Sequence, residues 1–173
     1  MSEDFDEKVI SHFQKSLPII ISVALSLLAY VPLNFNFFYN VRPDFGLMCI
    51  YFWMLHRPDL FGIMAIVVMS LVLSIISSSV MGCIFVAYLI MYVLVYNTQK
   101  LFNAKSFVVV WYGFIAFSLI SMLVKWIVVS VYYNEFLPIS MLMFGYLMGV
   151  VLYPMVSIVL AFVQNTFIQG DGI

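Results

Sequence analysis

The sequence predicts an all-α integral membrane protein that forms a six-helix transmembrane bundle. Hydrophobic residues make up 65% of the chain and charged residues only 9%, with a mean hydropathy of +1.13, whereas soluble domains are roughly a quarter charged. The apolar residues lie in continuous runs, which favours helices over the alternating strands of a β-barrel. Short polar segments, serines and prolines divide these runs into six predicted spans.

The polar residues 1–16 form a predicted cytoplasmic tail. Their apolar side chains recur at helical spacing between acids, so the tail is either a short amphipathic helix on the membrane surface or an unstructured segment. Residues 17–33 follow as the first span, with Pro18 in the first turn, where proline is tolerated. Because the tail is acidic rather than basic, we expect this span to be an uncleaved helix and not a signal peptide.

The short apolar segment Phe45–Leu55 is the second predicted helix. Eleven to thirteen residues of helix rise only about 20 Å, against a hydrocarbon thickness of about 30 Å. The segment therefore crosses a thin region packed by protein, borrows its flanks to cross, or is re-entrant. The aromatic loop at residues 34–41 that precedes it suits the membrane interface.

The uncharged run from Leu60 to Tyr96 is too long for one crossing, since a helix of its 37 residues would be about 55 Å long. Serine side chains compete with the helix for its own backbone. The three serines at 77–79 therefore divide the run into two predicted spans, 60–76 and 80–96. A polar loop is predicted at residues 97–106.

The fifth and sixth predicted spans are residues 107–133 and 138–163, separated by a short turn that contains Glu135. A second cytoplasmic tail, residues 164–173, follows the sixth span. The predicted organisation is thus one transmembrane domain, residues 17–163, between two short tails.

Six spans place both termini on the same side of the membrane. With the N-terminus in the cytoplasm, five basic loop residues lie inside and one outside, which is the bias of the positive-inside rule. A re-entrant second segment would move the later loops to the other side, so this bias supports counting it as a crossing. The inner residues are Lys8, Lys15, Arg57, Lys100 and Lys105, and the outer residue is Arg42.

The triplet Arg-Pro-Asp occurs on each side of the second segment, at residues 42–44 and 57–59. Proline suits the first turn of a helix, an Asp there faces the positive end of the helix dipole, and the Arg can pair with that Asp or with a lipid phosphate. Each triplet is therefore either a helix start at the membrane surface or a polar contact for a partner protein. The candidate structural or interface residues are Arg42, Pro43, Asp44, Arg57, Pro58 and Asp59.

Polar and small residues inside the spans are few. Lys125 lies about two turns before the outer end of the fifth span, and we expect it to snorkel to the interface; an intramembrane ion pair is the alternative. No acid lies in a span interior to pair with it, which argues against a proton relay. Gly145 and Gly149 suit close helix packing, either within the chain or with another subunit. Pro154 is expected to kink or loosen the same helix.

The residues give little support for catalysis or metal binding. The two histidines, His12 and His56, lie in no HExxH motif, and the sequence has no GxSxG motif and no paired intramembrane carboxylates. Cys49 and Cys83 lie in apolar runs and are interpreted as small buried hydrophobes. We therefore expect no enzymatic activity, cofactor or metal, and the net charge of −1 gives no reason to expect nucleic acid. Span serines are interpreted as helix contacts, with the lining of a weakly polar channel as the alternative: Ser70, Ser74, Ser118, Ser121 and Ser157.

Residues 41–62 carry the most specific pattern in the chain. Val-Arg-Pro-Asp-Phe-Gly-Leu leads into Ile-Tyr-Phe-Trp-Met-Leu and then into the second Arg-Pro-Asp. Downstream, residues 78–82 form a small-residue turn, and Tyr153 and Pro154 form an aromatic-proline pair. Together these features resemble the rod shape-determining protein MreD family over roughly residues 17–163. The chain departs from the family at Ser74, where many members carry Asp, and near Lys125, where an acid is common.

The resemblance implies a function that composition does not. MreD-type proteins are similar in fold to the substrate-binding membrane subunits of energy-coupling vitamin transporters. They are non-enzymatic parts of the elongasome in the bacterial inner membrane. They bind the bitopic protein MreC and help couple MreB filaments to the peptidoglycan synthases, RodA and its partner transpeptidase. The expected function is thus a cell-shape scaffold, with a substrate-binding subunit of a vitamin or small-molecule transporter as the alternative.

Overall fold

The computed structural model shows a bundle in which every regular element of the described residues is an α-helix. Three helices contain segments long and apolar enough to cross a membrane, namely Cys83–Lys100, Phe107–Tyr133 and Leu142–Thr166, so the chain has the character of a membrane protein. The described residues are 3–28, 30, 43–77, 80, 82–102, 106–136 and 138–167. The helices are α1 (Glu3–Leu28), α2 (Phe45–His56), α3 (Ile63–Ser77), α4 (Cys83–Phe102), α5 (Phe107–Tyr133) and α6 (Ile139–Phe167). The predicted aromatic loop at 34–41 and Arg42 lie outside the described residues.

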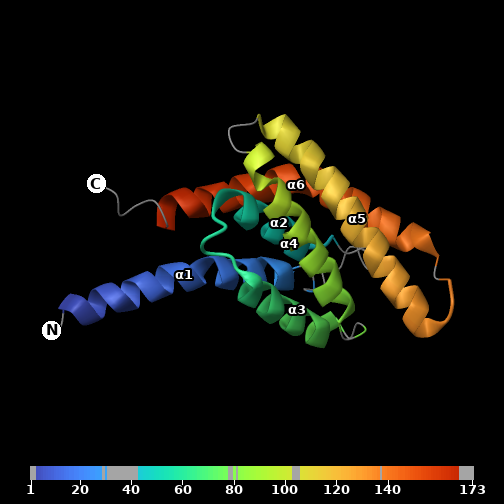
Figure 1. Cartoon of the computed structure of the whole chain (residues 1–173), viewed down its shortest axis with the longest axis horizontal. Helices are drawn as coiled ribbons and strands as arrows, with labels where there is room; N and C mark the ends of the chain where they lie inside the picture. The colour runs from blue at the N-terminus through green and yellow to red at the C-terminus, as the bar shows by residue number, and fades with distance from the viewer. Residues whose placement is uncertain are drawn as a thin grey trace.

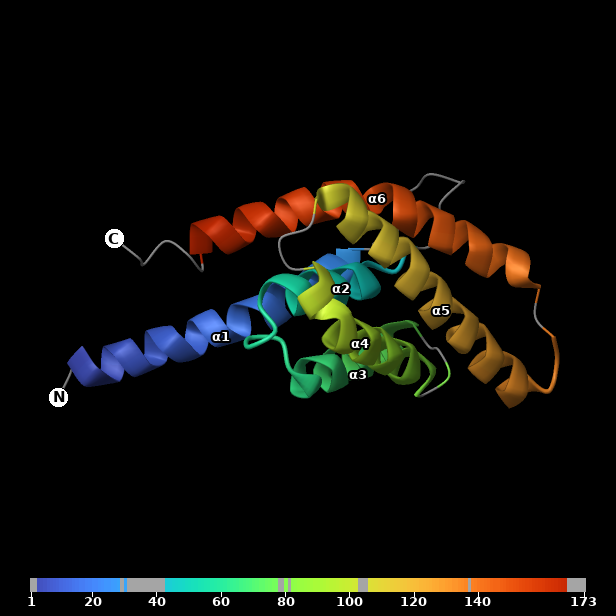
Figure 2. The ribbon, with the colours of Figure 1, turned by 45° about the horizontal axis from the view of Figure 1, so that its top comes forward.

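The short helix α2 lies at the centre of the bundle. It contacts α1, α4, α5 and α6, and Figure 2 shows it between α6 on one side and α3 and α4 on the other. All of its residues from Gly46 to Met54 are buried, as expected for a helix that is hydrophobic all round. The segment is therefore packed within protein along most of its length.

Helix α1 continues without a break across the predicted boundary between tail and first span. Its N-terminal part extends away from the other helices (Figure 1), and its apolar part is Ser16–Leu28. Pro18 lies inside the helix, and its carbonyl accepts a hydrogen bond from the buried hydroxyl of Ser22 at 2.6 Å. The predicted boundary is thus a change of composition within one helix and not a helix end.

The long apolar run divides between α3 and α4, so the break predicted at the serines is confirmed. Gly82 precedes α4 with a φ of +96°, a conformation that glycine adopts without the steric cost of a Cβ atom. The loop predicted at residues 97–106 is wrong in its first half, because α4 continues to Phe102. The hydroxyl of Thr98 donates to the carbonyl of Leu94 at 2.7 Å, so a polar side chain is accommodated within the helix.

Helices α5 and α6 form the last hairpin, and α5 has the bounds predicted for the fifth span. Pro154 lies inside α6 and has no N–H to donate to the carbonyl of Val150, four residues earlier. The indole Nε1 of Trp111 in α5 donates to that carbonyl at 3.1 Å. Because a carbonyl at membrane depth needs a partner from the protein, this contact compensates for the proline.

An aromatic cluster joins α2 to the α5–α6 hairpin. The rings of Phe114 and Tyr153 stack with centroids 4.2 Å apart, and Tyr51 lies edge-on to them at 5.4 and 5.7 Å. The hydroxyl of Tyr51 donates to the carbonyl of Val110 at 2.7 Å. The cluster therefore combines aromatic packing with a satisfied polar group, which is how buried tyrosines are usually placed.

Candidate functional site

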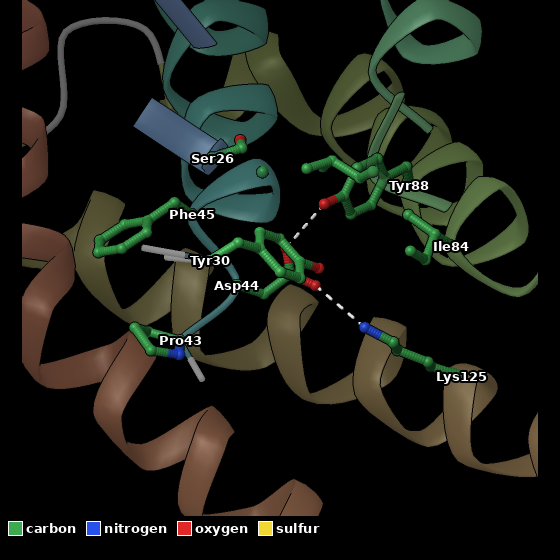
Figure 3. Close-up of a pocket in the computed structure, with 10 residues that line it drawn as sticks. Ser26, Tyr30, Pro43, Asp44, Phe45, Ile84, Tyr88 and Lys125 are labelled. Carbon is green, nitrogen blue, oxygen red and sulfur yellow. Dashed lines mark hydrogen bonds and ion pairs between the residues drawn. The ribbon is translucent and has the colours of Figure 1, made fainter. Parts of the chain in front are cut away.

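Asp44 is the N-cap of α2 and the centre of a polar cluster shown in Figure 3. Its Oδ1 accepts a hydrogen bond from the backbone N–H of Leu47 at 3.3 Å, as N-cap carboxylates do. The same oxygen accepts from the hydroxyl of Tyr88 in α4 at 2.8 Å. The other oxygen, Oδ2, lies 3.3 Å from the Nζ atom of Lys125 in α5. One carboxylate thus connects three helices.

Lys125 lies inside a helix that is long enough to cross a membrane. It precedes the last residue of α5 by about 12 Å along the helix axis, and the side chains of both Lys125 and Asp44 are 27% exposed. A charged group at such depth is costly unless it is paired. Of the two alternatives for Lys125, the ion pair is observed, and its partner Asp44 lies at the start of α2 and not in the interior of a span.

Gly46 allows α2 and α4 to approach each other at this cluster. A Cβ atom added to Gly46 would lie 2.6 Å from Cζ of Tyr88, which is closer than two carbon atoms can pack without displacement. Tyr88 is only 2% exposed, so its ring has little room to move away from α2. The glycine that follows Phe45 is thus needed for the close approach of the Tyr88 ring.

Cys83 adds a weak contact between α4 and α5 at the same level. Its Sγ atom lies 3.6 Å from the backbone carbonyl of Lys125, to which the thiol donates. Both cysteines are buried and free, as predicted.

A cavity of about 90 Å³ lies beside the ion pair (Figure 3). Ligand pockets usually enclose about 300–1,000 Å³, and one water takes about 30 Å³ of liquid volume. The cavity therefore has room for a few waters but not for a vitamin. Its lining includes the polar residues Ser26, Tyr30, Asp44, Tyr88 and Lys125, and it also includes Pro43.

The two Arg-Pro-Asp motifs take different conformations. In the first, a helix starts as predicted, with Asp44 as its N-cap, but Pro43 precedes the helix and does not lie in its first turn. In the second, Arg57 is the C-cap of α2, and its N–H donates to the carbonyl of Trp53 at 2.7 Å. Residues 58–60 then form a turn, and α3 begins only at Ile63. The second motif is therefore a helix end followed by a turn, and the helix start predicted for it is wrong.

The remaining predicted residues lie at different places in the fold. Pro58 is half-buried and Asp59 is exposed in the turn after α2. Gly149 is buried in α6 opposite α2, where an added Cβ atom would lie 3.5 Å from Cε of Met48. Gly145, one turn earlier, is half-buried. The structure thus brings Pro43 and Asp44 together with Lys125, but not with the second motif at the other end of α2.

Sequence reasoning missed the roles of Tyr88 and Trp111, and it missed the partner of Lys125. A signal for the ion pair existed, because the predicted topology places both the first Arg-Pro-Asp motif and the nearer end of the fifth span on the outer side. No comparable signal existed for Tyr88, which is one of 11 tyrosines in a strongly apolar chain.

Comparison of the chain with protein-family models, with curated proteins and with solved structures finds no match.

Proposed function

We propose that this protein is a non-enzymatic membrane scaffold of the MreD type in the bacterial cell-elongation machinery. The observation that carries the proposal is the position of Asp44, which lies in the motif that resembles this family and also joins three helices. Its carboxylate is held by Lys125, by Tyr88 and by a backbone N–H. Within the described residues these contacts join α2 to α4 and α5, which supports a structural role for the motif.

In this proposal the chain crosses the bacterial inner membrane six times, with both termini in the cytoplasm. The 12 residues of α2 reach only about 18 Å, so this helix needs other helices around it instead of lipid along its whole length. Its burial on all sides supports such a crossing. The distribution of basic residues supports the orientation.

The proposed binding surface for an MreC-like bitopic protein is the α5–α6 hairpin. Large apolar side chains are exposed along both helices, and helix association in lipid depends on close packing and a few polar contacts. The turn that contains Arg57 and Asp59 supplies polar contacts at the inner surface. The larger complex would include MreB and the synthases RodA and its transpeptidase.

A second candidate function is a substrate-binding membrane subunit of a vitamin or small-molecule transporter. The polar groups that converge on the cavity beside Asp44 and Lys125 favour it. The volume of that cavity, about 90 Å³, is well below that of ordinary ligand pockets. The scaffold is therefore the better-supported function.

An affinity pull-down from detergent-solubilised membranes of a walled bacterium tests the proposal. The wild-type chain is compared with Asp44→Ala and Arg57→Ala, and with Lys100→Ala as a control at an exposed position on α4. Size-exclusion chromatography shows which variants keep their fold. We expect the wild type to recover a coiled-coil, single-span MreC-like protein, with weaker recovery in the motif variants and unchanged recovery in the control.

A different partner would contradict the scaffold. Recovery of an ATPase pair, or of a bound small molecule without a protein partner, would identify the chain as a transporter subunit.

A further inference from the structure

A second cavity, of about 300 Å³, lies at the other end of α2 from Asp44. It is bounded by the last turn of α2, the first turn of α5 and the C-terminal half of α6. Its volume reaches the lower end of the range for small-molecule sites. Its walls include Phe52, His56, Phe107, Val110, Tyr153 and Ile158.

The cavity opens onto the apolar surface of the α5–α6 hairpin. Phe107 is 49% exposed and Ile158 is 69% exposed, although both line the cavity. They belong to segments that are long and apolar enough to cross a membrane, and Val159 and Phe162 beside them are also exposed. Where such helices cross a membrane, an apolar surface of this kind faces lipid. The molecule that enters this opening is therefore expected to come from the bilayer.

Tyr153 places a polar group in this apolar cavity. Its side chain is only 1% exposed and stacks on Phe114, yet its hydroxyl forms no hydrogen bond with any residue that the structure describes. A buried tyrosine hydroxyl usually has a partner. The cavity therefore presents an unused hydrogen-bond donor to its occupant.

His56 forms part of the cavity wall at the end of α2. Its ring stacks on Phe52 with centroids 4.2 Å apart. Its Nδ1 atom lies 2.9 Å from the carbonyl of Phe52 and must be the donor, because a carbonyl only accepts. The other ring nitrogen, Nε2, is a second polar atom, and His56 is an exposed residue. The cavity is also lined by Ser157, whose hydroxyl donates to the carbonyl of Pro154. The site thus combines apolar walls with polar groups at three positions, as an amphipathic ligand requires.

We propose that this cavity binds one acyl chain of a membrane phospholipid. The chain fills the space between Phe52, Val110 and Ile158, and an oxygen of the lipid accepts a hydrogen bond from the hydroxyl of Tyr153. The bound chain packs between α2 and the α5–α6 hairpin. This site is separate from the ion pair and opens onto the hairpin surface that is proposed above for the partner protein.

Photo-crosslinking of the full chain tests the proposal. The protein is reconstituted in nanodiscs that contain a phospholipid with a diazirine on its acyl chain, and crosslinked residues are mapped by mass spectrometry. We expect crosslinks at residues 107–110 and 153–161 in severalfold excess over exposed residues of α5 at 119–127. Uniform labelling of all these segments would overturn the proposal, because ordinary bilayer lipid labels exposed residues without preference.

A matched pair of variants locates the site. Ala161 lines the cavity, so Ala161→Phe fills it and should lower site crosslinking severalfold. Ala116 is exposed on α5 and does not line the cavity, so Ala116→Phe should leave site crosslinking unchanged. Thermal melts confirm that both variants fold. Equal crosslinking in the two variants would overturn the proposal.

The hydroxyl of Tyr153 has its own test. Tyr153→Phe removes only the donor and should lower site crosslinking about two- to tenfold, the value of one hydrogen bond. In a second experiment, the protein is crosslinked with a diazirine fatty acid, and unlabelled lipids are added as competitors. If unlabelled phospholipid lowers crosslinking at the cavity and unlabelled fatty acid does not, the result supports the phospholipid. If only the fatty acid lowers it, the proposal is overturned.

Discussion

Asp44 shows how a single side chain organises a protein in which charge is scarce. A carboxylate has about four acceptor positions, and here the backbone of α2, the hydroxyl of Tyr88 and the ammonium of Lys125 occupy three of them. The N-cap interaction fixes the start of α2, and the other two attach that start to α4 and α5. The charged form of the carboxylate is stabilised at this position because these three groups are all hydrogen-bond donors.

Replacing Lys125 with methionine should destabilise the fold. Removing one partner of a buried ion pair costs about 3–5 kcal/mol, because the other charge is left unpaired. Since both side chains keep 27% exposure, we expect a loss near the lower end, about 3 kcal/mol. The measurement is thermal unfolding in detergent, followed by tryptophan fluorescence.

The double variant with Asp44→Asn separates charge from packing. Asparagine keeps an acceptor for Leu47 and Tyr88 but carries no charge, so the double variant should be more stable than Lys125→Met alone. Lys100→Met, at an exposed position, serves as the control and should change stability by less than about 0.5 kcal/mol. Equal losses for the Lys125 and Lys100 variants would show that the ion pair contributes nothing.

Gly46→Ala should also destabilise the protein, by about 1–3 kcal/mol, as overpacking a tight contact does. The added methyl group overlaps the ring of Tyr88 and would push α4 away from α2. Gly62→Ala is the matched control, because nothing lies within 4 Å of a Cβ atom there. Comparable melting temperatures for the two variants would contradict the close approach of the Tyr88 ring.

At the scale of elements, the α5–α6 hairpin shows a dependence between a proline and a distant tryptophan. Pro154 frees the carbonyl of Val150, and Trp111 satisfies it from the neighbouring helix. Trp111→Phe keeps most of the aromatic surface but removes the donor, so it should cost about 1 kcal/mol. Thermal unfolding in detergent measures this cost.

Pro154→Ala tests the cause of that cost. Alanine restores the N–H that donates to Val150 within the helix, so Trp111→Phe should have a much smaller effect in this background. The coupling in a double-mutant cycle isolates the interaction. Additive effects would mean that Trp111 contributes packing alone.

At the scale of the whole molecule, cysteine labelling can determine the topology. Cys49 and Cys83 are both 0% exposed and should not react with a membrane-impermeant maleimide. In the proposed topology, single cysteines at the exposed positions Asp59, Ser106 and Thr166 are labelled from the cytoplasmic side, and one at Glu135 from the outside. Labelling of Asp59 and Glu135 from the same side would contradict six spans.

The helices were largely predictable from the sequence, and the site only in part. The bounds of α5 were predicted because polar residues and a turn flank an unbroken apolar run. The end of α4 was not, because residues 97–100 are polar by composition yet continue the helix. Asp44 was predicted as a helix start from local chemistry, but its contacts with Tyr88 and Lys125 join residues 44 and 81 positions apart.

The sequence by itself determined that this chain is helical, membrane-like and divided into apolar segments, because hydropathy and helix breaks act over a few residues. It also predicted a helix start at the first Arg-Pro-Asp motif as one of two alternatives. Only the tertiary structure decided that α2 is enclosed by other helices, that Lys125 is paired and that Trp111 replaces the bond lost at Pro154. Each of these depends on which helices become neighbours, and that choice is made by the packing of side chains from distant parts of the chain.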